Sequence, residues 1–235
     1  MPRFRLTLAA GAAACALSFA PAAHAIPIEL ALVLDASGSI SASEWNLQRN
    51  AYSNALASVL PIDGSVAISV VRFATTASVV RPLTLISSAA DRTALSDFFD
   101  TLAQGGNGGN TCIVCGIQQG EGTLTGTADR SLIDVSTDGV FNVGANPAGP
   151  AGTVGTAAWA VANDADAVNA LGIGVMPNFA AGAGSFNMTA PDFAAFETAL
   201  TDKLRRETGT ISEPGSVALL FAALGLAAVA RRRRA

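Results

Sequence analysis

The chain contains almost no histidine or lysine. Its 235 residues include a single histidine, His24, and a single lysine, Lys203. His24 lies in an N-terminal segment with the features of a secretory signal peptide, so we expect the mature protein to contain no histidine. This absence excludes Ser-His-Asp and Cys-His catalysis, and it excludes a zinc site built on histidine ligands.

The N-terminal segment has the three parts of a signal peptide. Arg3 and Arg5 form a short basic region, an apolar stretch follows at 6–22, and Ala23-His24-Ala25 is a cleavage site of small residues. We therefore expect residues 1–25 to be removed and the remainder to be exported. The alternative is an N-terminal membrane anchor, although the stretch is rich in alanine and ends at the cleavage pattern.

The C-terminal residues 211–235 carry a second sorting pattern. Glu213-Pro214 precedes an apolar segment at 217–230, and the chain then runs through Arg231, Arg232, Arg233 and Arg234. This layout resembles the PEP-CTERM sorting signal of Gram-negative bacteria, with Ser212 in the place of the usual first proline. The resemblance implies processing by an exosortase-type enzyme, contact with the inner membrane, and delivery to the cell surface or extracellular matrix. The alternative is an uncleaved tail anchor whose arginines lie on the cytoplasmic side.

Between these ends, residues 26–210 form one expected domain with few positive charges. Without Arg3, Arg5, Glu213 and the four terminal arginines, eight basic and seventeen acidic residues remain, a net charge of −9. This charge argues against nucleic acid as a partner, since phosphate binding needs basic side chains. It is compatible with cation binding and with solubility outside the cell.

Apolar strands alternate with amphipathic helices along this domain. Continuous apolar runs such as the one at 28–34 are typical of strands that are buried on both faces of a sheet. We expect strands at 28–34, 66–73, 78–80, 132–136, 171–176 and 185–188, and helices at 44–60, 91–102, 112–124, 156–167 and 191–206. The alternation predicts an α/β fold, a doubly wound and mostly parallel sheet of about six strands flanked by helices, with one short antiparallel strand.

The first strand ends in a motif of one acid and two hydroxyls, Asp35-Ala36-Ser37-Gly38-Ser39. Alternate side chains point the same way in extended backbone, so their oxygens can converge on one hard cation such as Mg²⁺, Mn²⁺ or Ca²⁺. The alternative is local and structural, because serine forms turns and aspartate caps helices. Ligands of doubly wound sheets bind at the carboxyl ends of the strands, where this motif lies.

Two further segments complete a family pattern. Thr111, in Gly109-Asn110-Thr111, precedes an expected helix, and Asp138, in Ser136-Thr137-Asp138-Gly139, follows the fourth strand. With Asp35, Ser37 and Ser39, these residues resemble the metal-ion-dependent adhesion site of von Willebrand factor A domains over nearly all of 28–207. The resemblance implies one bound divalent cation, with Mg²⁺ expected first and Mn²⁺ or Ca²⁺ as alternatives. It also implies an open coordination position that accepts a carboxylate from a partner.

Cys112 and Cys115 directly follow Thr111. Two cysteines this close form a disulfide in an oxidising compartment, here one that would stiffen the loop carrying Thr111. A free pair and a redox-active pair at a helix start are the alternatives. Zinc binding would need further ligands, and no other cysteine or histidine remains in 26–210.

Other polar and aromatic residues have more ordinary explanations. Asp134, inside the fourth strand, needs a partner such as Arg130 or Arg72. We interpret Asp164 and Asp166 as solvent-exposed acids, with a second cation site as the alternative. Trp45 and Phe141 are interpreted as core residues, with the rim of a binding face as the alternative.

The sequence as a whole predicts a binding module and not an enzyme. The expected partner is a protein or a polysaccharide, recognised through the cation. The alternatives are a membrane-anchored periplasmic assembly factor and a metal-dependent hydrolase. The absence of a nucleophile–base pair and the shallow site expected of this fold argue against the hydrolase.

Overall fold

A computed structural model of the chain describes residues 28–105 and 108–209. The expected signal peptide at 1–25 and the expected sorting tail at 211–235 lie outside the described residues, and so they remain predictions. Within the described ranges, every helix is too short or too polar to cross a membrane.

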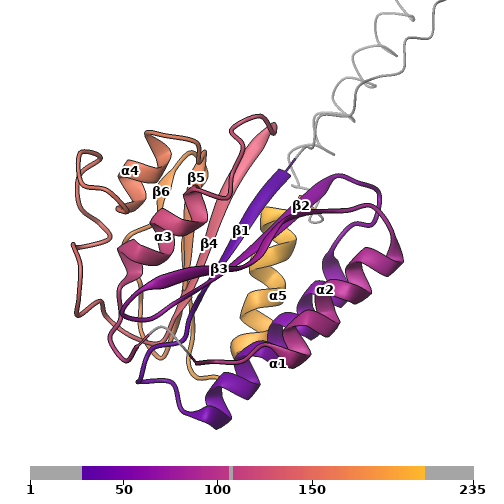
Figure 1. Cartoon of the computed structure of the whole chain (residues 1–235), viewed down its shortest axis with the longest axis horizontal. Helices are drawn as coiled ribbons and strands as arrows, with labels where there is room; N and C mark the ends of the chain where they lie inside the picture. Colours follow the sequence, from indigo (N-terminus) through magenta and orange to yellow (C-terminus); the bar gives the residue numbers. More distant parts are fainter. Residues whose placement is uncertain (1–27, 106–107, 210–235) are drawn as a thin grey trace, which may run out of the picture.

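The fold is a seven-stranded sheet with helices on both faces (Figure 1). Its main path runs β3-β2-β1-β4-β5-β6, and β7 also pairs with β5. The strands are β1 (Ile28–Asp35), β2 (Val66–Phe73), β3 (Ala77–Ile86), β4 (Arg130–Thr137), β5 (Ala167–Ile173), β6 (Ala181–Gly182) and β7 (Asn187–Ala190). β1, β2, β4, β5 and β7 pair in parallel, whereas β3 and β6 pair antiparallel. The predicted doubly wound, mostly parallel sheet is therefore confirmed.

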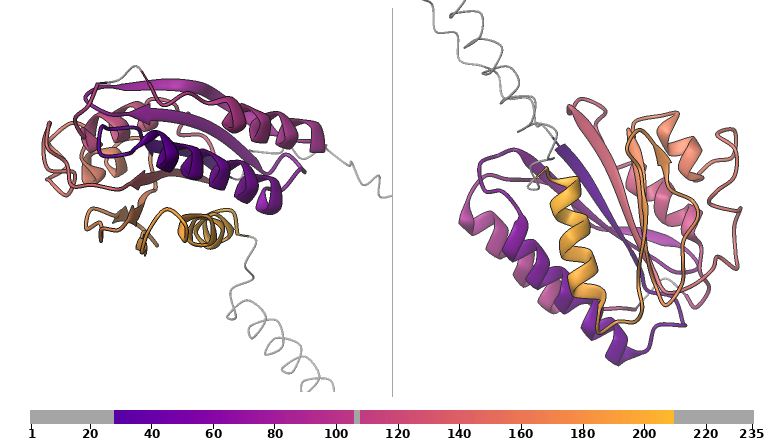
Figure 2. Two further views of the ribbon diagram at one scale, coloured as in Figure 1. Left: turned by 90° about the horizontal axis from the view of Figure 1, so that it is seen from below. Right: turned by 180° about the vertical axis from the view of Figure 1, so that it is seen from behind.

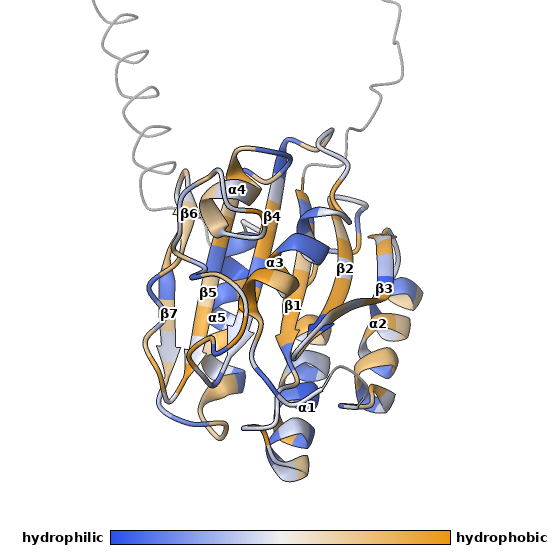
Figure 3. Cartoon of the chain, turned by 60° about the vertical axis from the view of Figure 1, so that its left-hand side comes forward, coloured by the Kyte–Doolittle hydropathy of each residue, from blue (hydrophilic) through white to orange (hydrophobic). Residues whose placement is uncertain are grey.

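Helices cover the sheet unequally. α1 (Ala42–Val59), α2 (Ala89–Thr101) and α5 (Phe196–Glu207) pack on one face, while the shorter α3 (Ile113–Glu121) and α4 (Ala157–Val161) pack on the other. α5 lies alongside α1, as Figure 2 shows from behind. Because both faces are covered, the central strands are apolar along most of their length (Figure 3).

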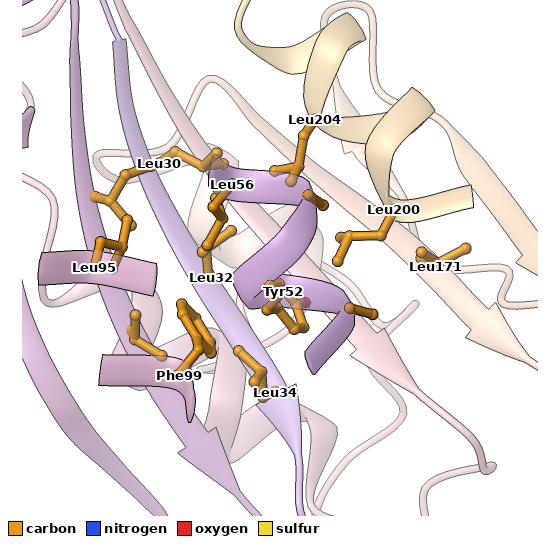
Figure 4. Close-up of a cluster of buried hydrophobic side chains, with 14 of the residues drawn as sticks. Leu30, Leu32, Leu34, Tyr52, Leu56, Leu95, Phe99, Leu171, Leu200 and Leu204 are labelled. Carbon is orange, nitrogen blue, oxygen red and sulfur yellow. The ribbon is translucent and has the colours of Figure 1, made fainter. Parts of the chain in front are cut away.

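Alternate residues of β1 point into two separate cores. Leu30, Leu32 and Leu34 face the larger core, in which Tyr52 of α1 stacks on Phe99 of α2 with ring centroids 5.0 Å apart (Figure 4). Ala31 and Val33 face the smaller core beneath α3 and α4. This period of two explains why a continuous apolar run, and not an alternating one, encodes the strand.

Glycine brings α3 unusually close to the sheet. A Cβ atom at Gly116 would lie 2.8 Å from side-chain atoms of both Phe73 and Val33, and one at Gly120 would lie 2.9 Å from Val33. The absent side chains let the helix settle directly on β1 and β2. The start of α3 is held at the end of β2 because the N–H of Cys112 donates to the carbonyl of Ala74 (2.8 Å).

Several expected boundaries differ from those in the structure, and for the strands the reason is that tertiary pairing outweighs local propensity. The helix expected at 156–167 ends at Val161, and β5 begins at Ala167, earlier than the expected 171, because it pairs with β4 from Leu132 onward. β3 spans ten residues along the sheet edge, not only 78–80. Most of its side chains are half-exposed, so the sequence lacks the continuous apolar run that marks a buried strand. α5 begins at Phe196 and not at Pro191. β6 was not expected at all.

Asp134 has a different partner from those expected. It forms an ion pair with Lys203 of α5, not with Arg130 or Arg72, and both side chains are fully buried. Lys203 also contacts Glu207 at 3.0 Å. Burial, and after it the negative charge of Asp134, raises the pKa of Glu207 to about 8. One buried cation thus holds two buried acids between the sheet and α5.

Replacing Lys203 by methionine should destabilise the domain strongly. Lys203→Met leaves Asp134 and Glu207 buried without their cation, a loss of about 3–5 kcal/mol in the free energy of unfolding. The matched control is Arg205→Met on the same helix, because Arg205 pairs with Asp202 at the surface (3.4 Å). We expect that change to cost less than about 1 kcal/mol. Denaturant unfolding measures both variants, and equal losses would show that the buried pair has no special role.

Candidate metal centre

Two neighbouring parallel strands end side by side at the rim of the sheet. β1 ends at Asp35 and β4 ends at Thr137, with Leu34 in register with Ser136. Parallel strands bring their carboxyl ends to one edge. The loops after β1 and β4 therefore meet, and the turn before α3 joins them from the face of the sheet that α3 covers.

Asp35 lies at the buried bottom of the site. Its side chain is fully buried, and its Oδ1 accepts the N–H of Ser37 (2.8 Å) while its Oδ2 accepts the hydroxyl of Thr137 (2.5 Å). Burial raises the pKa of Asp35 to about 6, against the lowering effect of the hydrogen bonds from Thr137 and Ser37. The carboxylate is thus fixed in orientation but costly to ionise without a compensating positive charge.

A chain of hydroxyls leads from this buried acid to the surface. The Oγ atoms of Ser37 and Ser39 lie 3.1 Å apart, and Ser39 donates to Oδ1 of Asp138 (2.8 Å). Ser37 is buried, whereas Ser39 is exposed. Partial burial raises the pKa of Asp138. Four of the five predicted ligands are therefore joined in one line from the interior to solvent.

Thr111 approaches the same point from the loop before α3. A Cβ atom built on Gly139 would lie 3.9 Å from Oγ of Ser39 and 4.0 Å from Oγ1 of Thr111, so these two hydroxyls flank one small space. The backbone of Thr111 is tied to Asn142, whose side chain accepts the Thr111 N–H (2.8 Å) and whose N–H donates to the Thr111 carbonyl (3.1 Å). The structure brings all five predicted residues together.

The donor set suits a hard divalent cation. Two carboxylates and three hydroxyls offer oxygen donors only, the kind that Mg²⁺, Mn²⁺ and Ca²⁺ accept. Within 28–105 and 108–209, no group of three or more histidine, cysteine or acidic side chains is arranged to hold a metal. With only two carboxylates among the five residues, an ion held here would also need the hydroxyls and water as ligands.

Several supporting residues escaped the sequence analysis. Thr137 orients Asp35, and Gln48 of α1 donates to the Asp35 carbonyl (3.1 Å). Gly38 lies against Gly109, and its N–H donates to the Gly109 carbonyl (2.9 Å). A Cβ atom at Gly38 would lie only 3.0 Å from that carbonyl oxygen, so a glycine fits best here. Thr137 precedes Asp138 in the sequence, but only the structure shows that its hydroxyl hydrogen-bonds to Asp35.

The cysteine pair forms a disulfide beside the site. Cys112 and Cys115 are bonded across the first turn of α3, directly after Thr111. The loop carrying Thr111 is thereby cross-linked to the helix that rests on the sheet.

The remaining predicted residues lie elsewhere. Trp45 is buried in the larger core, where its indole N–H donates to the Leu102 carbonyl (2.9 Å). Asp164 and Asp166 are exposed, as expected, and Asp166 accepts the N–H of Ser131 (2.7 Å). Phe141 is half-buried against the smaller core, and it also lines a pocket described below.

The fold is shared with solved structures of other proteins. Solved structures with the same fold include von Willebrand factor type A from Catenulispora acidiphila, which shares 16% identity at a TM-score of 0.57 over 79% of this chain and 43% of that one. The chain belongs to the family described as "Protein of unknown function (DUF1194)", whose pattern matches residues 25–212. No curated protein matches it in sequence.

Two other similar structures belong to adhesive or matrix proteins. Proximal thread matrix protein 1 from the mussel byssus, in a form with a zinc-occupied MIDAS motif, shares 17% identity at a TM-score of 0.55, over 75% of this chain and 46% of that one. The pilus adhesin SpaC from Lactobacillus rhamnosus GG shares 17% identity at a TM-score of 0.58, over 77% and 30%. The chain spans about half the length of the first of these proteins. At such identities the likeness shows the fold alone.

The burial of Asp35 predicts how stability changes with pH when metal ions are removed. The pKa of Asp35 rises from 3.8 to about 6 on folding, so the folded state binds the proton more tightly than the unfolded state. The contribution of Asp35 to the free energy of unfolding should therefore fall as pH rises from about 4 to about 6, and then level off.

Asp35→Asn should remove roughly 3 kcal/mol of this fall, because asparagine does not titrate. Denaturant unfolding in EDTA at several pH values measures it. The fall caused by Glu207 has the same sign and persists in both proteins, so the difference between them isolates Asp35. Parallel curves for the two proteins would contradict the assignment.

Proposed function

We propose that this protein is an exported binding module that recognises its partner through one divalent cation. Asp35, Ser37, Ser39, Thr111 and Asp138 would hold the cation, with Mg²⁺ expected before Mn²⁺ or Ca²⁺. The observation that carries the proposal is the convergence of these five oxygen-bearing side chains, from three separate loops, at one rim of the sheet.

The gradient of burial across the site suggests how binding would work. Asp35 and Ser37 are fully buried, Thr111 is 4% exposed, and Ser39 is open to solvent. The protein would coordinate the ion from its buried side, and the solvent-facing side of the ion would remain open to water or to a partner. When bound, the cation supplies positive charge that two carboxylates hold in place, and a partner carboxylate is the natural ligand for its open side.

Catalysis is the weaker alternative. Residues 28–209 contain no histidine, so no imidazole base stands beside the hydroxyls of the site. The acids at the site are engaged in hydrogen bonds that position them, with Asp35 accepting from Ser37 and Thr137. A positioned carboxylate of this kind supports ion binding more directly than proton transfer.

Display outside the cell rests on the two ends of the chain. The signal-like residues 1–25 and the sorting pattern at 211–235 support export, followed by exosortase-type processing at the inner membrane. The disulfide between Cys112 and Cys115 supports an oxidising compartment. A periplasmic assembly factor with an uncleaved tail is the second candidate, and cell fractionation distinguishes it from a surface protein.

Cation binding can be tested by melting the purified protein in EDTA and in Mg²⁺, Mn²⁺, Ca²⁺ or Zn²⁺. A cation at about a hundred times its Kd should stabilise the fold by roughly 2.7 kcal/mol, which corresponds to a rise in Tm of roughly 5–10 °C. Asp138→Ala should abolish the rise, because it removes a carboxylate of the site. Asp100→Ala, which removes an exposed acid of α2, is the matched control and should keep it. An unchanged Tm with every cation would refute the proposed function.

A further inference from the structure

An apolar pocket adjoins the candidate metal centre. It has a volume of about 190 Å³ and lies between the loop after β4 and the loop after β5. Phe179, only 4% exposed, is among its most buried lining residues, and Phe141, Pro147 and Ile113 add apolar surface. Thr137, Asn146 and Asn178 add uncharged polar groups to the lining. None of the residues that line it is charged. An apolar cavity of about 150 Å³ holds a benzene ring, so this pocket fits a single side chain and not a larger ligand.

The rim of the pocket exposes large apolar side chains to solvent. Val140 is 68% exposed and Met176 is 63% exposed, the two highest values among the large hydrophobic residues that the structure describes. Both line the pocket, one from each loop. Isolated apolar residues on a surface need no explanation, but two at the mouth of an apolar pocket mark a binding surface.

Gly139 links the pocket to the metal centre. It lines the pocket, and its missing Cβ would lie 3.9 Å from the hydroxyl oxygen of Ser39. Thr137, which donates to Asp35, lines the pocket as well. A single residue of this chain therefore separates the two features. Consecutive residues of an extended partner, whose Cα atoms are 3.8 Å apart, can reach both.

The centre also adjoins acidic side chains on its Asp138 side. There Glu44, Asp138 and Asp192 line a wider hollow of about 450 Å³. Its carboxylates disfavour a second acidic group on that side and favour a basic one. The metal centre thus adjoins both an uncharged pocket and an acidic hollow, and the two differ in charge.

We infer that the partner is a protein segment with an acidic residue next to an apolar side chain of leucine, methionine or phenylalanine size. The acidic residue binds at the cation, and the apolar side chain enters the pocket formed by Val140, Phe141, Met176 and Phe179. This inference rests on the proposed function, because the cation orients the acidic residue. It favours a protein over a polysaccharide, because the exposed apolar side chains of Val140 and Met176 at the rim match an apolar side chain better than a hydroxylated sugar ring.

Short capped peptides test the inference on the same preparation in which Mg²⁺ binding is first measured by calorimetry. N-acetyl-Asp-Phe-amide or N-acetyl-Phe-Asp-amide should bind about tenfold or more tightly than N-acetyl-Asp-Ser-amide, because one aromatic side chain is buried. N-acetyl-Asn-Phe-amide and D-glucuronate should bind weakly, and EDTA should abolish peptide binding. NMR titration measures each Kd.

A variant pair assigns the effect to the pocket. Val140→Ser with Met176→Ser removes the apolar rim without adding charge, and it should reduce the preference for phenylalanine over serine about fivefold or more. Val154→Ser changes an exposed valine (53% exposed) that does not line the pocket and should leave the preference intact. Melting curves in EDTA verify that all variants fold.

The possible results are distinguishable. Mg²⁺ binding without any preference for phenylalanine would overturn the inference and leave the proposed function intact. Peptide binding that persists in EDTA, or tighter binding of D-glucuronate than of either aspartyl-phenylalanine peptide, would also overturn it. Absence of Mg²⁺ binding would overturn the proposed function itself, and the inference with it.

Discussion

The parallel pairing of β1 with β4 is the constraint on which the candidate site depends. These strands are adjacent although a hundred residues separate them, and their register places Asp35 beside the end of β4. A slip of one residue would turn Thr137 away from Asp35. The register is in turn fixed by burial, because the leucines of β1 face the larger core and Ala31 and Val33 face the smaller one.

The two faces of the sheet have different roles in holding that rim. On the larger core, Tyr52 joins α1 to β4 through a 2.6 Å hydrogen bond with Ser136, one residue before Thr137. On the smaller core, Gly116 lets α3 lie close enough to β1 and β2 to place Thr111 at the rim. The loops that carry the ligands are thus supported from both sides, which limits the freedom of the oxygen donors before any ion arrives.

The sequence predicted what depends on nearby residues and missed what depends on distant ones. Asp35, Ser37 and Ser39 belong to one turn, and continuous apolar runs indicate the buried strands. Thr111 and Asp138 were found through a family resemblance, since no local pattern relates them to Asp35. The Lys203 partner of Asp134 could not be predicted, because the choice among distant cations is made by packing. The helix expected at 156–167 was too long and the start of β5 was missed, because the pairing of Ala167 with Leu132 of β4 is not visible in the sequence.

The burial of Lys203 also determines how the folded surface can be modified. It is the only lysine in the sequence, and its ammonium group is enclosed between β4 and α5. Amine-directed reagents, whether laboratory cross-linkers or lysine-modifying enzymes, therefore find no side-chain target on the folded domain and can react only at a free α-amino group. Amine labelling of the folded domain is therefore selective for the N-terminal α-amino group. Reactivity of Lys203 directly reports that α5 has detached from the sheet.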